Sequence, residues 1–342
     1  MKRLLNTLFV TTQGAYLSKQ RETVVISVDK EVKLRLPIHT LGSLVCFGQV
    51  SCSPFLLGLC AERGVSVSFL TEYGRFMAKV VGPISGNVLL RREQYRQADD
   101  PKSSAKIARA VVTGKLYNSR SVLRRAMRDH PDKTGDSVKA VERSLSGALT
   151  DLTKELPLDS VRGVEGDAAR RYFSVFNKLI TAQNEEFPFN GRSRRPPLDK
   201  VNSLLSFLYT LLLHDVRSAC EVVGLDPAVG FLHRDRPGRP SLALDLMEEF
   251  RSILSDRLVL SLINLRQVQP KGFEIRESGG VIMDDKTRKI VLVAWQERKR
   301  DTVMHPFIKE KIRLGLFPYV QALLMARHLR GDLDGYPPVI WR

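Results

Sequence analysis

The pattern of apolar and polar residues divides the chain into two halves near residue 84. In the first half, apolar and polar residues alternate in short runs separated by turn residues, as in strands with one buried face. These runs cover residues 7–10, 15–19, 23–29, 32–37, 65–70 and 76–81. One segment, residues 53–64, instead carries helical start and stop signals. We therefore expect residues 1–84 to form a β-rich domain with one helix.

From residue 88 to about residue 270, the apolar residues recur at the helical spacing of about 3.6 residues. Later in the chain, Phe273–Arg276 and Ile290–Val293 flank a Gly-Gly pair and an Asp-Asp pair. This pattern predicts a mainly α-helical domain over residues 85–342, with an inserted β-hairpin near residues 272–294. The fold class expected for the whole chain is therefore α+β.

The chain is strongly basic: 54 Lys and Arg residues against 37 Asp and Glu give a formal net charge of +17. Such a charge attracts phosphate backbones or an anionic membrane surface. The most apolar run, Leu204–Leu213, is stopped by His214-Asp215 and is shorter than the roughly 20 residues that span a bilayer. We therefore expect a buried helix in this run, no membrane association, and nucleic acid as the partner.

The cysteines and the first residues indicate a cytoplasmic protein. The four cysteines have no C-x-x-C spacing, which argues against a structural zinc site and a disulfide framework. Basic residues precede an apolar run at Met1–Val10, but Asn6 and Thr7 interrupt that run and no small-residue cleavage site follows. We expect reduced thiols and no secretory signal.

The segment from Arg91 to Arg128 holds eleven Lys and Arg residues and three acidic residues. Charge runs of this kind are usually a solvated helical face. In a chain that is already basic, part of this segment is equally suited to contact phosphates. Both interpretations stay open.

A helical segment, residues 241–251, places Asp245 and Glu248 three residues apart on one face. Two like charges at this spacing repel each other unless a cation, such as a divalent metal, lies between them. Ordinary solvated acids on an amphipathic helix give the same pattern. The preceding loop, residues 230–240, favours the metal, because His233 is set there among Arg234, Arg236 and Arg239.

Neighbouring arginines keep an imidazole neutral, which is the form that binds metals, and they can hold a nucleic-acid phosphate beside it. A third ligand, Glu165, lies between Gly163 and Gly166, in what we expect to be a turn that opens a helix. By itself this short motif is weak. With His233 and Glu248 it supplies the oxygen and nitrogen donors that suit Mg or Mn, and the imidazole favours Mn.

Four segments in this order resemble CRISPR-associated protein 1, the integrase of the spacer-acquisition module. They are Arg162–Gly166, Leu198–Tyr209, Gly230–His233 and Leu244–Arg251. The resemblance extends from the β-rich half to the tail Tyr336–Trp341 and so covers essentially the whole chain. The tail and the His233 loop most resemble the version found beside type I-C interference systems.

The resemblance implies an N-terminal β-sandwich that dimerises, a helical catalytic domain and a Mg or Mn site. By motif position the metal ligands are Glu165, His233 and Glu248. Asp245 completes the catalytic set, either as a further ligand or directly behind the ligands. The last acidic position is often Asp in the family and is Glu248 here, which keeps an oxygen ligand.

The implied activity is a metal-dependent DNA endonuclease and integrase. Attack by a DNA 3′-hydroxyl inserts a short duplex fragment into a repeat array, whereas attack by water leaves a nick. The implied partners are double-stranded DNA, a second copy of the chain and CRISPR-associated protein 2. Arg162 and Lys299 join the three loop arginines as candidate DNA contacts, although residues 296–300 could equally form an exposed helix face.

Two other functions remain in competition. His214-Asp215 is the dipeptide that binds metal in HD-type phosphohydrolases, but such a site also needs an upstream histidine, and His130 lies in an expected loop. Alternatively, the chain is a non-catalytic basic DNA-binding protein whose acids are merely solvated. In that protein, replacing Glu165 or His233 would leave every activity unchanged.

Overall fold

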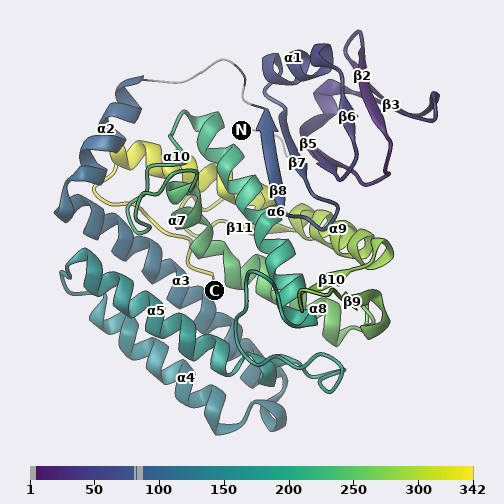
Figure 1. Ribbon diagram of the computed structural model, residues 1–342. Helices are drawn as coiled ribbons and strands as arrows, with labels where there is room; N and C mark the ends of the chain where they lie inside the picture. The colour runs from purple at the N-terminus through teal and green to yellow at the C-terminus, as the bar shows by residue number, and fades with distance from the viewer. Residues whose placement is uncertain (1–4, 81, 83–87, 342) are drawn as a thin grey trace. The chain divides into compact units, whose positions relative to one another are not determined.

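The computed structural model describes residues 5–80, 82 and 88–341, and the chain forms two compact units, residues 1–85 and 86–342. The first unit is rich in strands and the second is mainly helical, which confirms the predicted α+β class (Figure 1). No helix in the described part of the chain is long and apolar enough to cross a membrane.

The first unit contains two four-stranded sheets. One sheet has the order β1 (Asn6–Val10), β5 (Leu41–Phe47), β7 (Ser66–Leu70), β8 (Phe76–Val80). The other has the order β4 (Glu31–Pro37), β3 (Thr23–Val28), β2 (Tyr16–Gln20), β6 (Ser51–Cys52). The strand β5 runs parallel to both of its neighbours, and the sequence pattern did not predict it.

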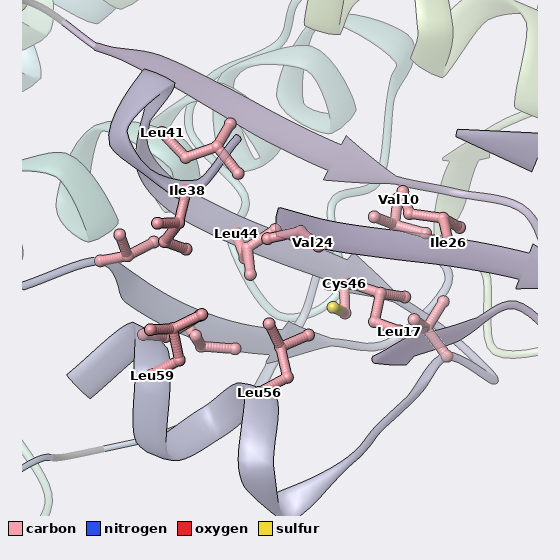
Figure 2. Close-up of a cluster of buried hydrophobic side chains, with 14 of the residues drawn as sticks. Val10, Leu17, Val24, Ile26, Ile38, Leu41, Leu44, Cys46, Leu56 and Leu59 are labelled. Carbon is pink, nitrogen blue, oxygen red and sulfur yellow. The ribbon is translucent and has the colours of Figure 1, made fainter. Parts of the chain in front are cut away.

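The two sheets share one hydrophobic core, which agrees with the expected β-sandwich (Figure 2). Leu44 from β5 and Val24 from β3 are both fully buried in it. The helix α1 (Pro54–Glu62) adds Leu56 and Leu59. This helix begins where the sequence predicts, because the Ser53 side chain accepts a hydrogen bond from the Leu56 backbone N–H.

The second unit is built from helices. They are α2 (Val88–Asp99), α3 (Pro101–Asp129), α4 (Pro131–Asp151), α5 (Leu158–Ser174), α6 (Lys200–Val223), α7 (Ser241–Phe250), α8 (Arg257–Asn264), α9 (Asp285–Arg300) and α10 (Phe317–Leu329). Figure 1 shows α3 lying beside α4 and α5, and α3 also contacts α7. The predicted apolar run at 204–213 lies within α6 and is largely buried, as expected.

The predicted hairpin near residues 272–294 is partly wrong. Strands β9 (Phe273–Ile275) and β10 (Val281–Met283) do pair, but Ile290–Val293 lies in α9. Asp284 caps that helix by accepting the Thr287 N–H, and the buried residues Val291, Leu292 and Trp295 follow helical spacing. A second short hairpin, β11 (Thr302–Met304) with β12 (Lys311–Arg313), follows.

The C-terminal tail, residues 336–341, is tied to α3 and α7. Asn118 of α3 donates to the Val339 carbonyl at 2.9 Å and accepts the Trp341 N–H at 2.7 Å. Glu249 of α7, fully buried, accepts hydrogen bonds from Tyr336 Oη at 2.6 Å and from the Val339 N–H at 2.7 Å. These bonds hold the tail in a fixed position along the middle of α3.

Candidate functional site

The four predicted catalytic residues come together in the helical unit. Glu165 lies on α5, Asp245 and Glu248 lie on α7, and His233 lies in the loop before α7. Glu165 is not in a turn, as the sequence suggested: α5 begins at Leu158, and the flanking glycines are inside it. A Cβ at either glycine would meet no atom within 4 Å, so both glycines lie on an open face of α5.

The Asp245 carboxylate organises the His233 loop. Its Oδ2 accepts the backbone N–H groups of Phe231 at 2.6 Å and Leu232 at 3.0 Å, and its Oδ1 accepts the N–H of His233 at 3.0 Å. The same Oδ1 lies 2.6 Å from His233 Nδ1. Four donors therefore occupy the two carboxylate oxygens. This favours a role in which Asp245 positions the ligand His233 over one in which Asp245 itself coordinates the metal.

Gly230 makes this arrangement possible. A Cβ at this position would lie 2.8 Å from Asp245 Oδ2 and 2.7 Å from the Ser241 carbonyl carbon. Only glycine lets the loop backbone approach α7 this closely. Arg162 fixes the other side of the loop, since its Nε donates to the Leu232 carbonyl at 2.6 Å.

His233 presents one nitrogen to the acidic residues. Because its Nδ1 faces the Asp245 carboxylate, the proton is assigned to Nδ1 and the lone pair to Nε2. Nε2 lies 4.0 Å from Glu248 Oε1. The imidazole is thus oriented with Nδ1 toward Asp245 and Nε2, the nitrogen free to bind a metal, toward Glu248.

A lysine that sequence reasoning missed lies between the two glutamates. The Lys115 ammonium of α3 pairs with Glu165 Oε1 and lies 2.7 Å from Glu248 Oε2. Arg251 lies 3.0 Å from the other oxygen, Glu248 Oε1. Burial disfavours the charged carboxylate, but Arg251 and Lys115 outweigh it and lower the pKa of Glu248 to about 2. Glu248 is therefore ionised, although it is 2 % exposed.

The donor set fits a divalent cation once the lysine moves. Among the described residues, no three His, Cys, Asp or Glu side chains already surround one metal position. The space between Glu165 and Glu248 nevertheless holds a cation, the Lys115 ammonium, and His233 Nε2 lies 4.0 Å from Oε1 of the same Glu248 carboxylate. Two carboxylates and one imidazole are the donors that Mg or Mn takes.

The predicted DNA contacts separate into two groups. Arg234 and Arg236 are exposed within the His233 loop, and Arg239 is half-buried there. Arg162 lies on α5 and donates a hydrogen bond to the loop backbone. Burial, together with nearby Arg236, lowers the pKa of Arg239, as expected where positive charge is in excess.

The predicted DNA contact of Lys299 is wrong. Its side chain is 7 % exposed, and its ammonium lies 2.7 Å from Asp215 Oδ2 inside the helical unit. The same ion pair engages the aspartate of His214-Asp215, so that dipeptide does not support an HD-type metal site.

Known proteins resemble this chain along most of its length. The model of the family "CRISPR associated protein Cas1" matches residues 8–297. A CRISPR-associated endonuclease Cas1 of Chlorobaculum tepidum is 57% identical over 343 residues, covering 100% of both chains. One of Rhodospirillum rubrum is 53% identical over 347 residues, again covering 100% of both chains.

Solved structures share the fold. A casposase bound to its integration product has a TM-score of 0.85 at 22% identity and covers 99% of this chain and 95% of that one. A Cas1 protein from Thermotoga maritima has a TM-score of 0.82 at 23% identity and covers 95% of this chain and 97% of that one. The family match and the full-length identity together show that the chain belongs to the Cas1 family of CRISPR-associated endonucleases.

Proposed function

We propose that the chain joins the 3′ ends of short duplex DNA fragments to a repeat array, and nicks DNA at the same site when water replaces the 3′-hydroxyl. The observation that carries this proposal is the cation position between Glu165 and Glu248, with His233 Nε2 lying 4.0 Å from the Glu248 carboxylate. Solvated acids on a non-catalytic protein would not enclose a part-buried ammonium.

The residues divide into ligands and supports. Glu165, Glu248 and His233 hold Mg or Mn, which when bound stabilises charge on a scissile phosphate and lowers the pKa of the attacking group. Asp245 keeps the imidazole in the tautomer that leaves Nε2 free to coordinate. Lys115, displaced from the two glutamates, is then available to a DNA phosphate.

The strand-transfer step conserves phosphodiester bonds. The 3′-oxygen of the incoming fragment forms a bond to phosphorus, the bond from phosphorus to the 3′-oxygen of the target strand breaks, and the proton of the attacker ends on the leaving oxygen. With water as attacker the same bond breaks without a new junction. One site thus supports both integration and nicking.

The positive charge supplies the means to hold DNA. The formal net charge of +17 favours many phosphate contacts, and Arg234 and Arg236 are exposed beside the proposed metal position. A Cas6-RT-Cas1–Cas2 complex, of which this chain covers 36% at a TM-score of 0.81, shares the fold. We extend the partnership with CRISPR-associated protein 2 to this chain as part of the proposal.

A homodimer through the β-rich unit belongs to the same proposal. On its edge strand β8, Phe76 is 45% exposed and Met77 is 60% exposed, which suits a surface that a second copy covers. The proposal also includes a cytoplasmic location and assignment to the type I-C version of the family. The assignment to type I-C rests on the residues of the tail and of the His233 loop.

The reaction class is tested by the chemistry of the fragment end. A duplex with 2′,3′-dideoxy ends cannot attack, so with Mn it should give no joined product while the target strand is still nicked. A matched duplex with free 3′-hydroxyls should give joined strands. Equal joining by both duplexes would refute the transesterification.

A further inference from the structure

A cavity of about 450 Å³ lies in the helical unit between α3, the start of α8 and the C-terminal tail. Arginines dominate its lining, and two aromatic residues complete it. The lining arginines are Arg120, Arg124, Arg125, Arg128 and Arg257, and the aromatic residues are Tyr117 and Trp341. None of the proposed metal ligands lines it.

The cavity is separate from the candidate metal centre. Lys115 and Arg124 are nine residues apart on the same helix, which is about 13 Å along the axis and half a turn round it. The cavity therefore opens on the opposite face of α3 from the glutamates. The positive charge of its five lining arginines is therefore not part of the metal centre.

The arginines outnumber the acids that pair with them. Arg120 and Arg124 share one carboxylate, Glu142, with Nε–Oε1 distances of 2.7 and 2.6 Å. Arg125 and Arg128 in turn share Asp129. Two carboxylates thus pair with four guanidinium groups, which leaves two positive charges unbalanced in the lining of the cavity.

Arg257 has no ion pair at all among residues 5–80, 82 and 88–341. Burial, with the charges of Arg298 and Arg125, lowers the pKa of Arg257 to about 10. Its guanidinium instead lies 6.0 Å from the centre of the Trp341 ring. An unpaired, half-buried arginine is stabilised when an anion enters beside it.

The aromatic wall is held in place before any ligand binds. The Trp341 backbone N–H donates to Asn118 Oδ1, and Asn118 is fully buried in the middle of α3. This bond fixes the Trp341 backbone, and the indole packs against Phe317, with ring centres 6.5 Å apart, and against the Arg257 guanidinium. Positive groups beside an aromatic surface are what proteins use to hold a phosphate and stack an unpaired base.

We propose that this cavity binds a single-stranded segment of the DNA substrate, with its phosphates on the arginines and a base against Trp341. A volume of about 450 Å³ is in the range of pockets that hold one small ligand, which suits a nucleotide and is too small for a duplex. In a duplex the bases are stacked on one another, so their faces cannot reach the ring. The proposal rests on the proposed function only in taking DNA as the ligand.

The test is binding of short labelled oligonucleotides, single-stranded and duplex, to the full chain by fluorescence anisotropy. We expect the double variant Arg124→Gln/Arg257→Gln to lose about tenfold or more of its affinity for the single strand. Losing two phosphate contacts should reduce the salt slope by about 1.4. Affinity for the blunt duplex should change by less than about twofold. Equal affinity of variant and wild type for the single strand would overturn the proposal.

Controls separate the cavity from general charge and from folding. Arg170→Gln/Arg171→Gln removes two exposed arginines from α5 and should leave single-strand affinity near the wild-type value. Unfolding midpoints check that the cavity variant folds, and Arg124→Gln alone, at an exposed position, gives a milder second variant. An equal loss in the α5 control would mean non-specific attraction and would overturn the cavity assignment.

Two further readouts identify the ligand. Quenching of Trp341 fluorescence by the single strand, absent in Trp341→Phe, supports stacking, because Trp295 is buried. If ATP or pyrophosphate displaces the strand at equal concentration, the cavity takes free phosphates and the DNA assignment is overturned. Glu165→Gln should lose strand transfer yet keep single-strand binding, so failure of one proposal is distinguishable from failure of the other.

Discussion

Asp245 Oδ1 lies 2.6 Å from His233 Nδ1, and the same carboxylate accepts three successive backbone N–H groups that end at His233. One buried side chain therefore sets both the loop backbone and the imidazole tautomer. The loop arginines, including Arg234 and Arg236, are carried along with it. Asp245 thus acts through His233, as a positioning residue.

Asp245→Asn should weaken Mn binding about 10- to 100-fold, because the amide cannot serve four donors and no longer holds the proton on His233 Nδ1. Calorimetric titration of the DNA-free protein with Mn measures this without relying on activity. Asp235→Asn, an exposed change in the same loop, is the control and should bind Mn normally. Unchanged affinity in Asp245→Asn would mean that the carboxylate only supports the fold.

Lys115→Met should make stability depend on metal. Without the ammonium, Glu165 loses its ion pair and Glu248 keeps only Arg251, and removing one partner of a buried ion pair costs up to about 3–5 kcal/mol. We expect a lower unfolding midpoint in EDTA and a larger increase on adding Mn than in wild type. Lys102→Met, on an exposed part of the same helix, should do neither. A variant with wild-type midpoints in both conditions would contradict the cation position.

The buried Glu249 predicts a pH dependence of folding. Burial raises its pKa to about 8 from 4.5, against the opposing hydrogen bonds from Tyr336, Val339 and Gln321. The folded state thus favours the protonated form, so this group's contribution to stability falls as pH rises from about 4.5 to 8. The total change is on the order of 5 kcal/mol.

Urea unfolding of wild type and Glu249→Gln at a series of pH values isolates this contribution, since the other titrating groups are common to both proteins. As the pH rises, the unfolding free energy of wild type should fall relative to that of Glu249→Gln. A difference that stays constant between pH values of about 5 and 8 would contradict the raised pKa.

Gly163→Ala and Gly166→Ala should each stabilise α5 by about 0.5–1 kcal/mol, because glycine is disfavoured inside a helix and the added methyl meets open space. Thermal unfolding measures the gain. Gly230→Ala is the contrast: its Cβ would press on the Asp245 carboxylate and should destabilise the protein. Destabilisation at the two α5 positions would show that this face of the helix is not open.

The sequence identified the strands that have one exposed face but missed β5. Its residues, Leu41–Phe47, are nearly all buried because the strand has parallel neighbours on both sides. Such a strand carries no alternation to detect. Conversely, the apolar run Ile290–Val293 resembles a strand, and only its cap and Trp295 mark it as helical.

The candidate site was predictable only in part, because sequence motifs identify some of its residues and not others. Glu165, His233 and Glu248 could be named from residue type, motif order and a family resemblance. The structure places Lys115 between the two glutamates and His233 Nε2 4.0 Å from Glu248. Lys115 could not, because in a run of eleven basic residues one lysine looks like any other. The buried ion pair of Lys299 was hidden in the same way, since its partner Asp215 is distant in sequence.

The most direct test of the central claim compares Glu165→Gln with wild type in three measurements: Mn binding, strand transfer of a duplex fragment, and affinity for duplex DNA. Asp167→Asn, an exposed acid two residues away on α5, is the matched control. We predict that Glu165→Gln loses Mn binding and strand transfer while duplex affinity stays within about twofold of wild type. Strand transfer at the wild-type rate in Glu165→Gln would contradict a metal held by Glu165, His233 and Glu248.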